Sequence, residues 1–401
     1  MRLIKQCSLK IYAGSLLFLL SFLPFVSPLP LGSDVQPLAH IYALLLLFSA
    51  RQFRFVKVHQ VFILLSVIFS VLYFPFGNVG DVNIVKAFAL PIAFTFYLAV
   101  CSIKYEKHSS IIKFVILLYF ILSILFLLFP EQFIKFQSFF VRNVNSKELG
   151  YRGISTLSTE PGLFAGMMVA IFAILKWYWD KKIITNREFL VLATCILLMI
   201  LWSKSGTGMI YLAFYLLLMI FFAMSFFTRI FISLFIAGSL MVLLSMGSEF
   251  SLIKNAISGE YGRGWQVFSI LIFNFEKFMG DSSILYRLYA LTTAFISTVQ
   301  YPMGVGHDEV LNASNNIVSS YPFLADFYSQ SKFGFRLVSS FGYYLTAFGL
   351  VFLCFIGYLL YTSKSSWENK ILAMLLLSFS YSIIFPLIWV LLALGKNNVR
   401  N

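Results

Sequence analysis

One glutamate and three arginines beside apolar segments are the residues of this chain best suited to chemistry. Arg152 and Glu160 lie in YRGISTLSTEPGLFAG (151–166), directly before an apolar run. Arg287 lies in DSSILYR, at the polar start of another apolar run, and Arg263 lies upstream of it. A charged side chain at the edge of a membrane is costly there, so each of these residues is a candidate for function.

Structural explanations for the same residues stay open. In STEPG, Pro161 favours the first turn of a helix and Ser158 or Thr159 can cap that helix, so Glu160 can simply mark a helix start. Arg287 can be an interfacial anchor that extends its charge toward water. Arg152 has no such explanation.

His307 is a further candidate, as a base. It begins the triplet His-Asp-Glu directly after PMGVG (302–306), where glycines permit an open loop. A solvated histidine is the commoner outcome at such a place, and GVG alone is a weak signal for a phosphate site. The four histidines have no metal-ligand spacing and the chain has no Asp-x-Asp, so neither a metal site nor a cofactor is predicted.

The composition indicates the elements that must position these residues. Of 401 residues, 60% are hydrophobic and only 11% are charged, which no soluble domain can bury. Apolar runs long enough to cross about 30 Å of hydrocarbon recur along the chain. We expect an all-α, polytopic membrane protein in a single domain (1–401) with about eleven spans. They are placed at 10–29, 37–50, 59–76, 84–103, 111–129, 158–175, 189–203, 208–227, 230–249, 337–362 and 371–394.

The short loops predict the orientation. With the N-terminus in the cytoplasm, the inner loops carry most of the basic residues behind the net charge of +14, as the positive-inside rule requires. A nucleic-acid partner is not expected, because the excess lies in short loops beside lipid headgroups. The basic residues on that side are Arg2, Lys5, Lys10, Arg51, Arg54, Lys57, Lys104, Lys107, Lys176, Lys181, Lys182, Arg187, Arg229, Lys364 and Lys370.

Two long connections, 130–157 and 250–336, then share the outer, periplasmic side. Long loops in a compact protein are usually functional. The second loop is partly helical, because 265–279 and 284–302 are apolar enough to lie against the bilayer or re-enter it. The last span contains Pro386, so it is either one kinked helix or a hairpin that returns the chain to its starting side.

These motifs together resemble a known family. The motifs are Arg-Gly before a Glu-Pro helix start, an arginine about fifteen residues before PMGVG, and SSFGYYLTAFGLVFL (339–353). They resemble the bacterial O-antigen and capsular-polysaccharide repeat-unit polymerases, whose superfamily includes the O-antigen ligases. The resemblance implies a fold like that of the GT-C membrane glycosyltransferases and a location in the bacterial inner membrane. The ligases carry His-Asn where this chain has Ser339-Ser340, which favours a polymerase.

The resemblance also implies roles. Arg152 and Arg287 would bind the pyrophosphate of a polyprenyl-linked oligosaccharide, with Arg263 as a third candidate, and Glu160 or His307 would take the acceptor proton in a metal-independent, inverting transfer. A flippase and a chain-length regulator are the implied protein partners. Two other classes stay open: a transporter of lipid-linked oligosaccharides, which would show related halves and a central cavity, and a structural or sensory membrane protein.

Overall fold

The computed structural model describes residues 2–26, 35–49, 67, 84–141, 153–225, 227–230, 233, 282–330, 339–379 and 381–395. Over these residues the chain is helical and has no β-strand, as predicted. The first part contains α1 (Arg2–Ser21), α2 (Leu38–Ser49), α4 (Ile84–Cys101), α5 (Ser109–Leu128), α6 (Pro130–Gln137), α7 (Pro161–Asp180), α8 (Asn186–Trp202) and α9 (Gly206–Ala223). The second contains α13 (Ser282–Gln300), α14 (Gly306–Ser320), α15 (Pro322–Gln330), α16 (Ser340–Phe348), α17 (Leu350–Thr362), α18 (Trp367–Phe379) and α19 (Pro386–Ala393).

Three helical stretches among the described residues are long and apolar enough to cross a membrane: Tyr105–Leu128, Pro161–Asp180 and Gly206–Ala223. One face of α5 presents apolar side chains outward, as a face toward lipid would. Its exposed fractions lie between 40% and 63% at Phe114, Leu117, Ile121, Leu125 and Leu128. The described part of the chain is therefore all-helical and contains helices suited to a bilayer, and the number of spans stays a prediction. The predicted spans 59–76 and 230–249 lie almost entirely outside the described residues.

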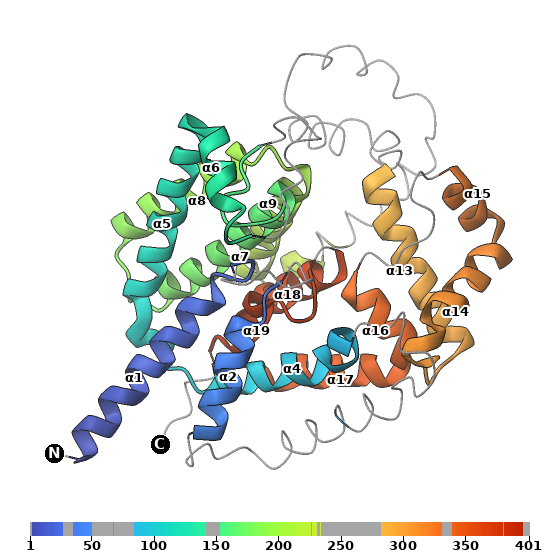
Figure 1. Ribbon diagram of the computed structural model, residues 1–401, viewed down its shortest axis with the longest axis horizontal. Coiled ribbons are helices and arrows are strands. Elements are labelled where there is room, and N and C mark those ends of the chain that lie inside the picture. Colours follow the sequence, from blue (N-terminus) through green and yellow to red (C-terminus); the bar gives the residue numbers. More distant parts are fainter. Residues whose placement is uncertain are drawn as a thin grey trace.

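Helix α7 forms the centre of the bundle. It packs against α5, α8, α9, α18 and α19, and Figure 1 shows it between the α5–α8 side and the α18–α19 pair. The four consecutive residues from Met167 to Ala170 are fully buried. Successive helical residues point about 100° apart, so protein covers every side of α7. A helix that is apolar all round belongs in such a position.

The predicted span 337–362 is interrupted. Helices α16 and α17 meet at Gly349, whose φ is +56°. A side chain there would place its Cβ 2.2 Å from the carbonyl oxygen of Pro302, so the close approach of the 302–304 segment requires glycine. Gly304, with φ +80°, makes the matching approach to the carbonyl oxygen of Ala347. Gly304 of PMGVG thus serves packing against this break.

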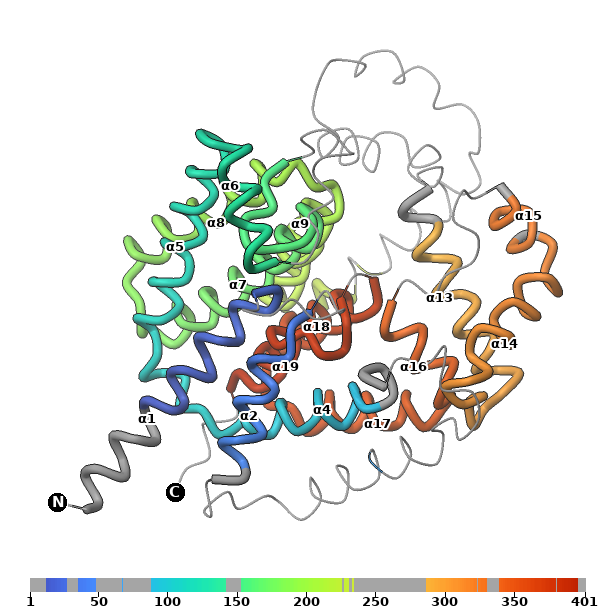
Figure 2. The backbone as a smooth tube through the Cα atoms, viewed as in Figure 1, coloured from blue at the N-terminus to red at the C-terminus, as the bar shows by residue number. Residues whose placement is uncertain are grey.

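The predicted last span is a hairpin. Helix α18 ends at Phe379 and α19 begins at Pro386, and the two helices pack against each other. The hydroxyls of Ser363 and Ser365, just before α18, donate to the carbonyl oxygens of Leu392 and Leu391 at the end of α19, each at 2.6 Å. The chain therefore returns to where α18 started, and Figure 2 shows both helices side by side at the centre of the molecule.

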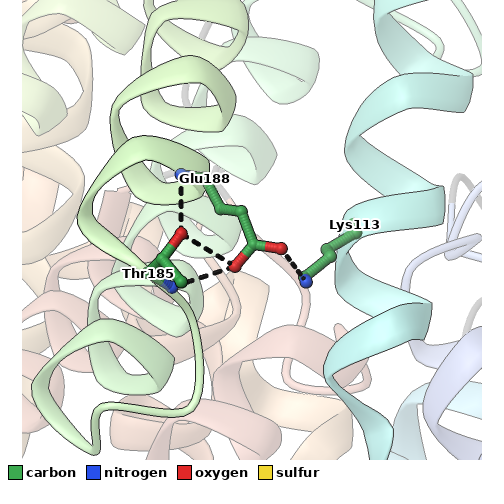
Figure 3. A network of polar contacts seen from close by, with 3 residues as sticks. All are labelled: Lys113, Thr185 and Glu188. Atoms are coloured by element: carbon green, nitrogen blue, oxygen red, sulfur yellow. Dashed lines mark hydrogen bonds and ion pairs between the residues drawn. The ribbon is translucent and has the colours of Figure 1, made fainter.

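An ion pair ties α5 to α8. Figure 3 shows Glu188 accepting from the Lys113 ammonium through one carboxylate oxygen and from the Thr185 backbone N–H through the other, the latter at 2.9 Å. Thr185 in turn caps α8 by accepting from the Glu188 N–H. The Lys113 hydrogen bond, followed by the Thr185 bond, lowers the pKa of the Glu188 carboxyl.

Candidate active site

Helices α7 and α9 run in parallel and begin side by side. Gly208, in the first turn of α9, lies so close to Ala165 of α7 that a Cβ on Gly208 would be 2.2 Å from the Ala165 Cβ. A Cβ on Gly162 would lie 3.6 Å from the Ser205 hydroxyl oxygen. Small residues allow two backbones to approach in this way. The unpaired N–H groups of both helix starts therefore share one end of the bundle, where the helix dipoles favour negative charge.

The turn between α8 and α9 supplies a cation to this end. Ser205 caps α9 by accepting from the Gly208 N–H at 3.2 Å, and the Ser203 hydroxyl accepts from the Ser205 N–H at 3.3 Å. Between them, Lys204 adopts a left-handed conformation (φ +50°) and its side chain is exposed. The sequence analysis did not single out this WSKSGTG segment; a lysine between helix-capping serines, at the boundary of two apolar runs, was the available signal.

The segment 153–160 packs onto the same turn. The Ile154 N–H donates to the Trp202 carbonyl oxygen at 3.2 Å. Gly153 has φ +142°, and a Cβ there would be 2.0 Å from the Ser203 carbonyl oxygen. From the other side, the Gln137 amide donates to the Ser158 carbonyl oxygen at 2.7 Å. The glycine after Arg152 is thus required for docking, and Arg152 itself lies outside the described residues, as does Arg263.

Glu160 stands at the junction of this segment with α7. It is the N-cap residue in extended conformation, Pro161 is the first helical residue, and the Glu160 side chain is exposed. The helix start predicted from STEPG is confirmed, but the predicted cap is wrong. The Ser158 hydroxyl donates to the Glu160 carbonyl oxygen at 3.3 Å instead, and the buried Thr159 hydroxyl has no partner among the described residues. The carboxylate of Glu160 makes no hydrogen bond or ion pair with any described residue.

Arg287 reaches the same end from α13. Its side chain is half-buried, and one guanidinium nitrogen donates to the Thr207 hydroxyl in the first turn of α9 at 3.2 Å. Within the described part of the chain, no carboxylate pairs with this guanidinium and its other N–H groups make no hydrogen bond. The structure therefore gathers Glu160, Lys204 and Arg287 around the paired starts of α7 and α9.

His307 lies elsewhere. It is 3% exposed in the first turn of α14, its Nδ1 is 2.9 Å from the Tyr343 hydroxyl, and its ring packs edge-on against Phe348 at 5.1 Å between centroids. Burial lowers the pKa of His307 to about 4, so the ring is neutral at neutral pH. Arg287 is near the start of α13 and His307 follows its end, and thirteen residues of helix measure about 20 Å. The structure does not bring these two residues together.

Comparison with protein-family models, curated proteins and solved structures finds no match to this chain. Among the described residues, no three His, Cys, Asp or Glu side chains gather in a way that could hold a metal ion. The site consists of two cations, one exposed carboxylate and two helix starts at one end of an apolar bundle.

Proposed function

We propose that this chain is a membrane glycosyltransferase that joins lipid-linked oligosaccharide repeat units into a polysaccharide on the periplasmic face of a bacterial inner membrane. The observation that carries the proposal is the position of Arg287, which Thr207 holds at the paired starts of α7 and α9. The remaining N–H donors of Arg287 bind none of the described residues, and the exposed carboxylate of Glu160 lies at the same end.

The donor is an oligosaccharide on a polyprenyl pyrophosphate. The bond between its first sugar carbon and the pyrophosphate oxygen breaks, and the hydroxyl oxygen of the next repeat unit attacks that carbon from the opposite face, which inverts its configuration. Negative charge grows on the leaving pyrophosphate, where the Arg287 guanidinium, the Lys204 ammonium and the helix starts stabilise it. Glu160 accepts the proton of the attacking hydroxyl. A lone pair of the hydroxyl oxygen thus forms the new bond to carbon, the electron pair of the old bond leaves with the pyrophosphate, and the proton ends on Glu160.

The resemblance adds Arg152 and Arg263 to the pyrophosphate site as part of the same proposal. Arg152 stands directly before Gly153, the residue that docks on the carbonyl of Ser203 next to Lys204. This neighbourhood supports a clamp made by Arg152 and Arg287. The helix starts of α7 and α9 face the periplasm in the proposed topology, because the basic connection between α7 and α8 is assigned to the cytoplasm.

The geometry favours Glu160 over His307 as the base. An exposed carboxylate can meet a sugar hydroxyl, whereas the unpartnered Nε2 of His307 is buried among aromatic rings. A base must come within about 3 Å of the proton that it takes. The tyrosines and tryptophans of the outer loops are proposed sugar contacts, and a flippase and a chain-length regulator are proposed partners.

Deletion of the gene, followed by electrophoresis of the surface polysaccharide, tests the reaction class. A ladder that collapses to a single repeat unit supports a polymerase. Polymer that stays on its lipid carrier indicates a ligase, and loss of even the single unit indicates a transporter.

Purified variants test the residues. With lipid-linked repeat units as the substrate, Glu160→Gln should reduce the rate of chain extension at least about a hundredfold, because it removes the base and keeps the shape. Arg287→Lys should reduce it by a similar factor, because lysine loses the planar pair of donors. Glu131→Gln is the matched control, since Glu131 is an exposed acid in α6 on the same proposed side. Wild-type rates in both site variants would remove this site from the reaction.

A further inference from the structure

The tip of the α18–α19 hairpin reaches the first turns of α7. Tyr381, in the tip, is 2% exposed and its hydroxyl donates to the carbonyl oxygen of Leu163. Leu163 is three residues after Glu160, within one helical turn of it. The only element between this contact and the exposed carboxylate is therefore the first turn of α7.

A glycine makes the contact fit. A Cβ on Gly166 would lie 2.5 Å from the Tyr381 hydroxyl oxygen and 3.2 Å from the Tyr211 ring of α9. Glycine is less favourable than alanine inside a helix, and here the missing Cβ makes room for the Tyr381 ring. Gly166, Tyr211 and Tyr381 thus bring α7, α9 and the hairpin tip together at one point.

The same tyrosine and the candidate cation contact the paired starts of α7 and α9. The Arg287 guanidinium is held by Thr207 in the first turn of α9, and the Tyr381 hydroxyl is held by Leu163 in the first turn of α7. The hairpin is fixed at its base by Ser363 and Ser365, and inside its tip the Trp389 indole N–H donates to the Ile383 carbonyl oxygen at 2.7 Å. The Tyr381 ring is consequently held from the hairpin side and cannot follow α7 freely.

From this arrangement we infer that Tyr381 is a positioning residue: its hydroxyl fixes the first turn of α7, and with it the place of Glu160 relative to Arg287. The inference rests on the proposed function for its role in catalysis. The contact itself is a property of the folded chain, so the two can fail separately.

Tyr381→Phe removes only the hydroxyl and is the main test. Backbone hydrogen exchange of residues 161–167 should become roughly two- to tenfold faster, the worth of one hydrogen bond, in the purified protein without substrate. The turnover number for chain extension should fall by a similar factor or more with little change in the Michaelis constant. The acid side of the pH–rate profile should also move, because Glu160 has a new environment; a general loss of stability would only scale the profile.

Tyr178→Phe is the matched control. The Tyr178 hydroxyl is on the same helix, is buried, and donates to the Tyr105 carbonyl oxygen at 2.7 Å, but it lies toward the opposite end of α7. Tyr178→Phe should lower thermal stability as Tyr381→Phe does. It should leave the hydrogen exchange of residues 161–167, the turnover number and the pH–rate profile unchanged.

A double-mutant cycle gives an independent test. Gly166→Ala alone should destabilise the protein because its Cβ meets the Tyr381 hydroxyl. In Tyr381→Phe the nearest ring atom, Cε2, is 3.1 Å from that Cβ, so the same substitution should cost less.

Unchanged exchange at 161–167 in Tyr381→Phe would overturn the inference, as would wild-type turnover despite faster exchange, or additive effects in the cycle. If the wild-type protein extends no chain while exchange responds as expected, the proposed function fails and the positioning of α7 by Tyr381 stands.

Discussion

The contact between Gly208 and Ala165 sets the spacing of the α7 and α9 starts, and one methyl group should disturb it. In Gly208→Ala the two Cβ atoms would be 2.2 Å apart, while ordinary contact begins at 3.4 Å, so the helices must separate by roughly the difference of 1.2 Å. Neither atom is at the end of a flexible side chain. Overpacking of this kind costs about 1–3 kcal/mol, and alanine returns at most about 1 kcal/mol in helix propensity.

The expected result is a net loss of about 1–2 kcal/mol of stability, read from thermal unfolding of the purified protein in detergent. A displacement of about 1 Å in a catalytic arrangement can cost about a hundredfold in rate, so chain extension should fall by more than the stability loss explains. Gly357→Ala is the matched control, because a Cβ on Gly357 in α17 meets nothing within 4 Å. It should be neutral or slightly stabilising.

The reciprocal variant decides the cause. Ala165→Gly combined with Gly208→Ala moves the methyl group from one helix to the other, and the new Cβ then meets the residue 165 Cα at 3.4 Å, an ordinary contact. Stability and chain extension should recover. A Gly208→Ala protein that behaves like Gly357→Ala, or a double variant that is worse than Gly208→Ala, would refute the reasoning.

Three further outcomes are expected. Because the pKa of the Glu188 carboxyl is lowered in the folded protein, its bond with Lys113 stabilises the fold above the ordinary carboxyl pKa, and this contribution disappears as the pH falls through the lowered pKa. The difference in melting temperature between wild type and Glu188→Gln should therefore close in acid. A difference that stays constant with pH would contradict this prediction. His307→Ala should lower stability by about 2–4 kcal/mol through the cavity that it leaves, yet keep chain extension per folded molecule within about threefold, so a selective loss of rate would return His307 to the mechanism. A cysteine at the exposed Ser138 should react with a membrane-impermeant thiol reagent in intact spheroplasts, whereas a cysteine at the exposed Ser366 should react only after lysis. The reverse result would invert the topology.

The helical class and most helix positions could be predicted, because they depend on the length and polarity of continuous segments. The α7 start at Pro161 and the α13 helix around Arg287 follow from such local signals. The hairpin at Pro386 stayed one of two alternatives, because its direction is decided by Ser363 and Ser365, which contact α19 from far away in the sequence.

The candidate site was only partly predictable for the same reason. Glu160 and Arg287 were found because a charge is conspicuous beside an apolar run. Lys204 was missed because its role depends on a turn that brings it next to Gly153. His307 was offered as a base because glycines precede it. Gly304, however, packs against the α16–α17 break, and the aromatic residues around the ring come from α16.

The apolar middle of α7, which protein covers on every side, has a consequence for biosynthesis. Its neighbours α9, α18 and α19 are made after it, so in the proposed topology α7 remains in the bilayer during synthesis with sides that are later covered by protein. Lipid tails accept an apolar helix on every side, so this waiting state costs little. The hairpin is the opposite case: α18 and α19 have 13 and 8 residues, each too short to cross about 30 Å of hydrocarbon alone. We therefore expect α7 to insert early and independently of the other helices. The α18–α19 hairpin should insert last, against a surface of α7 that protein does not yet cover.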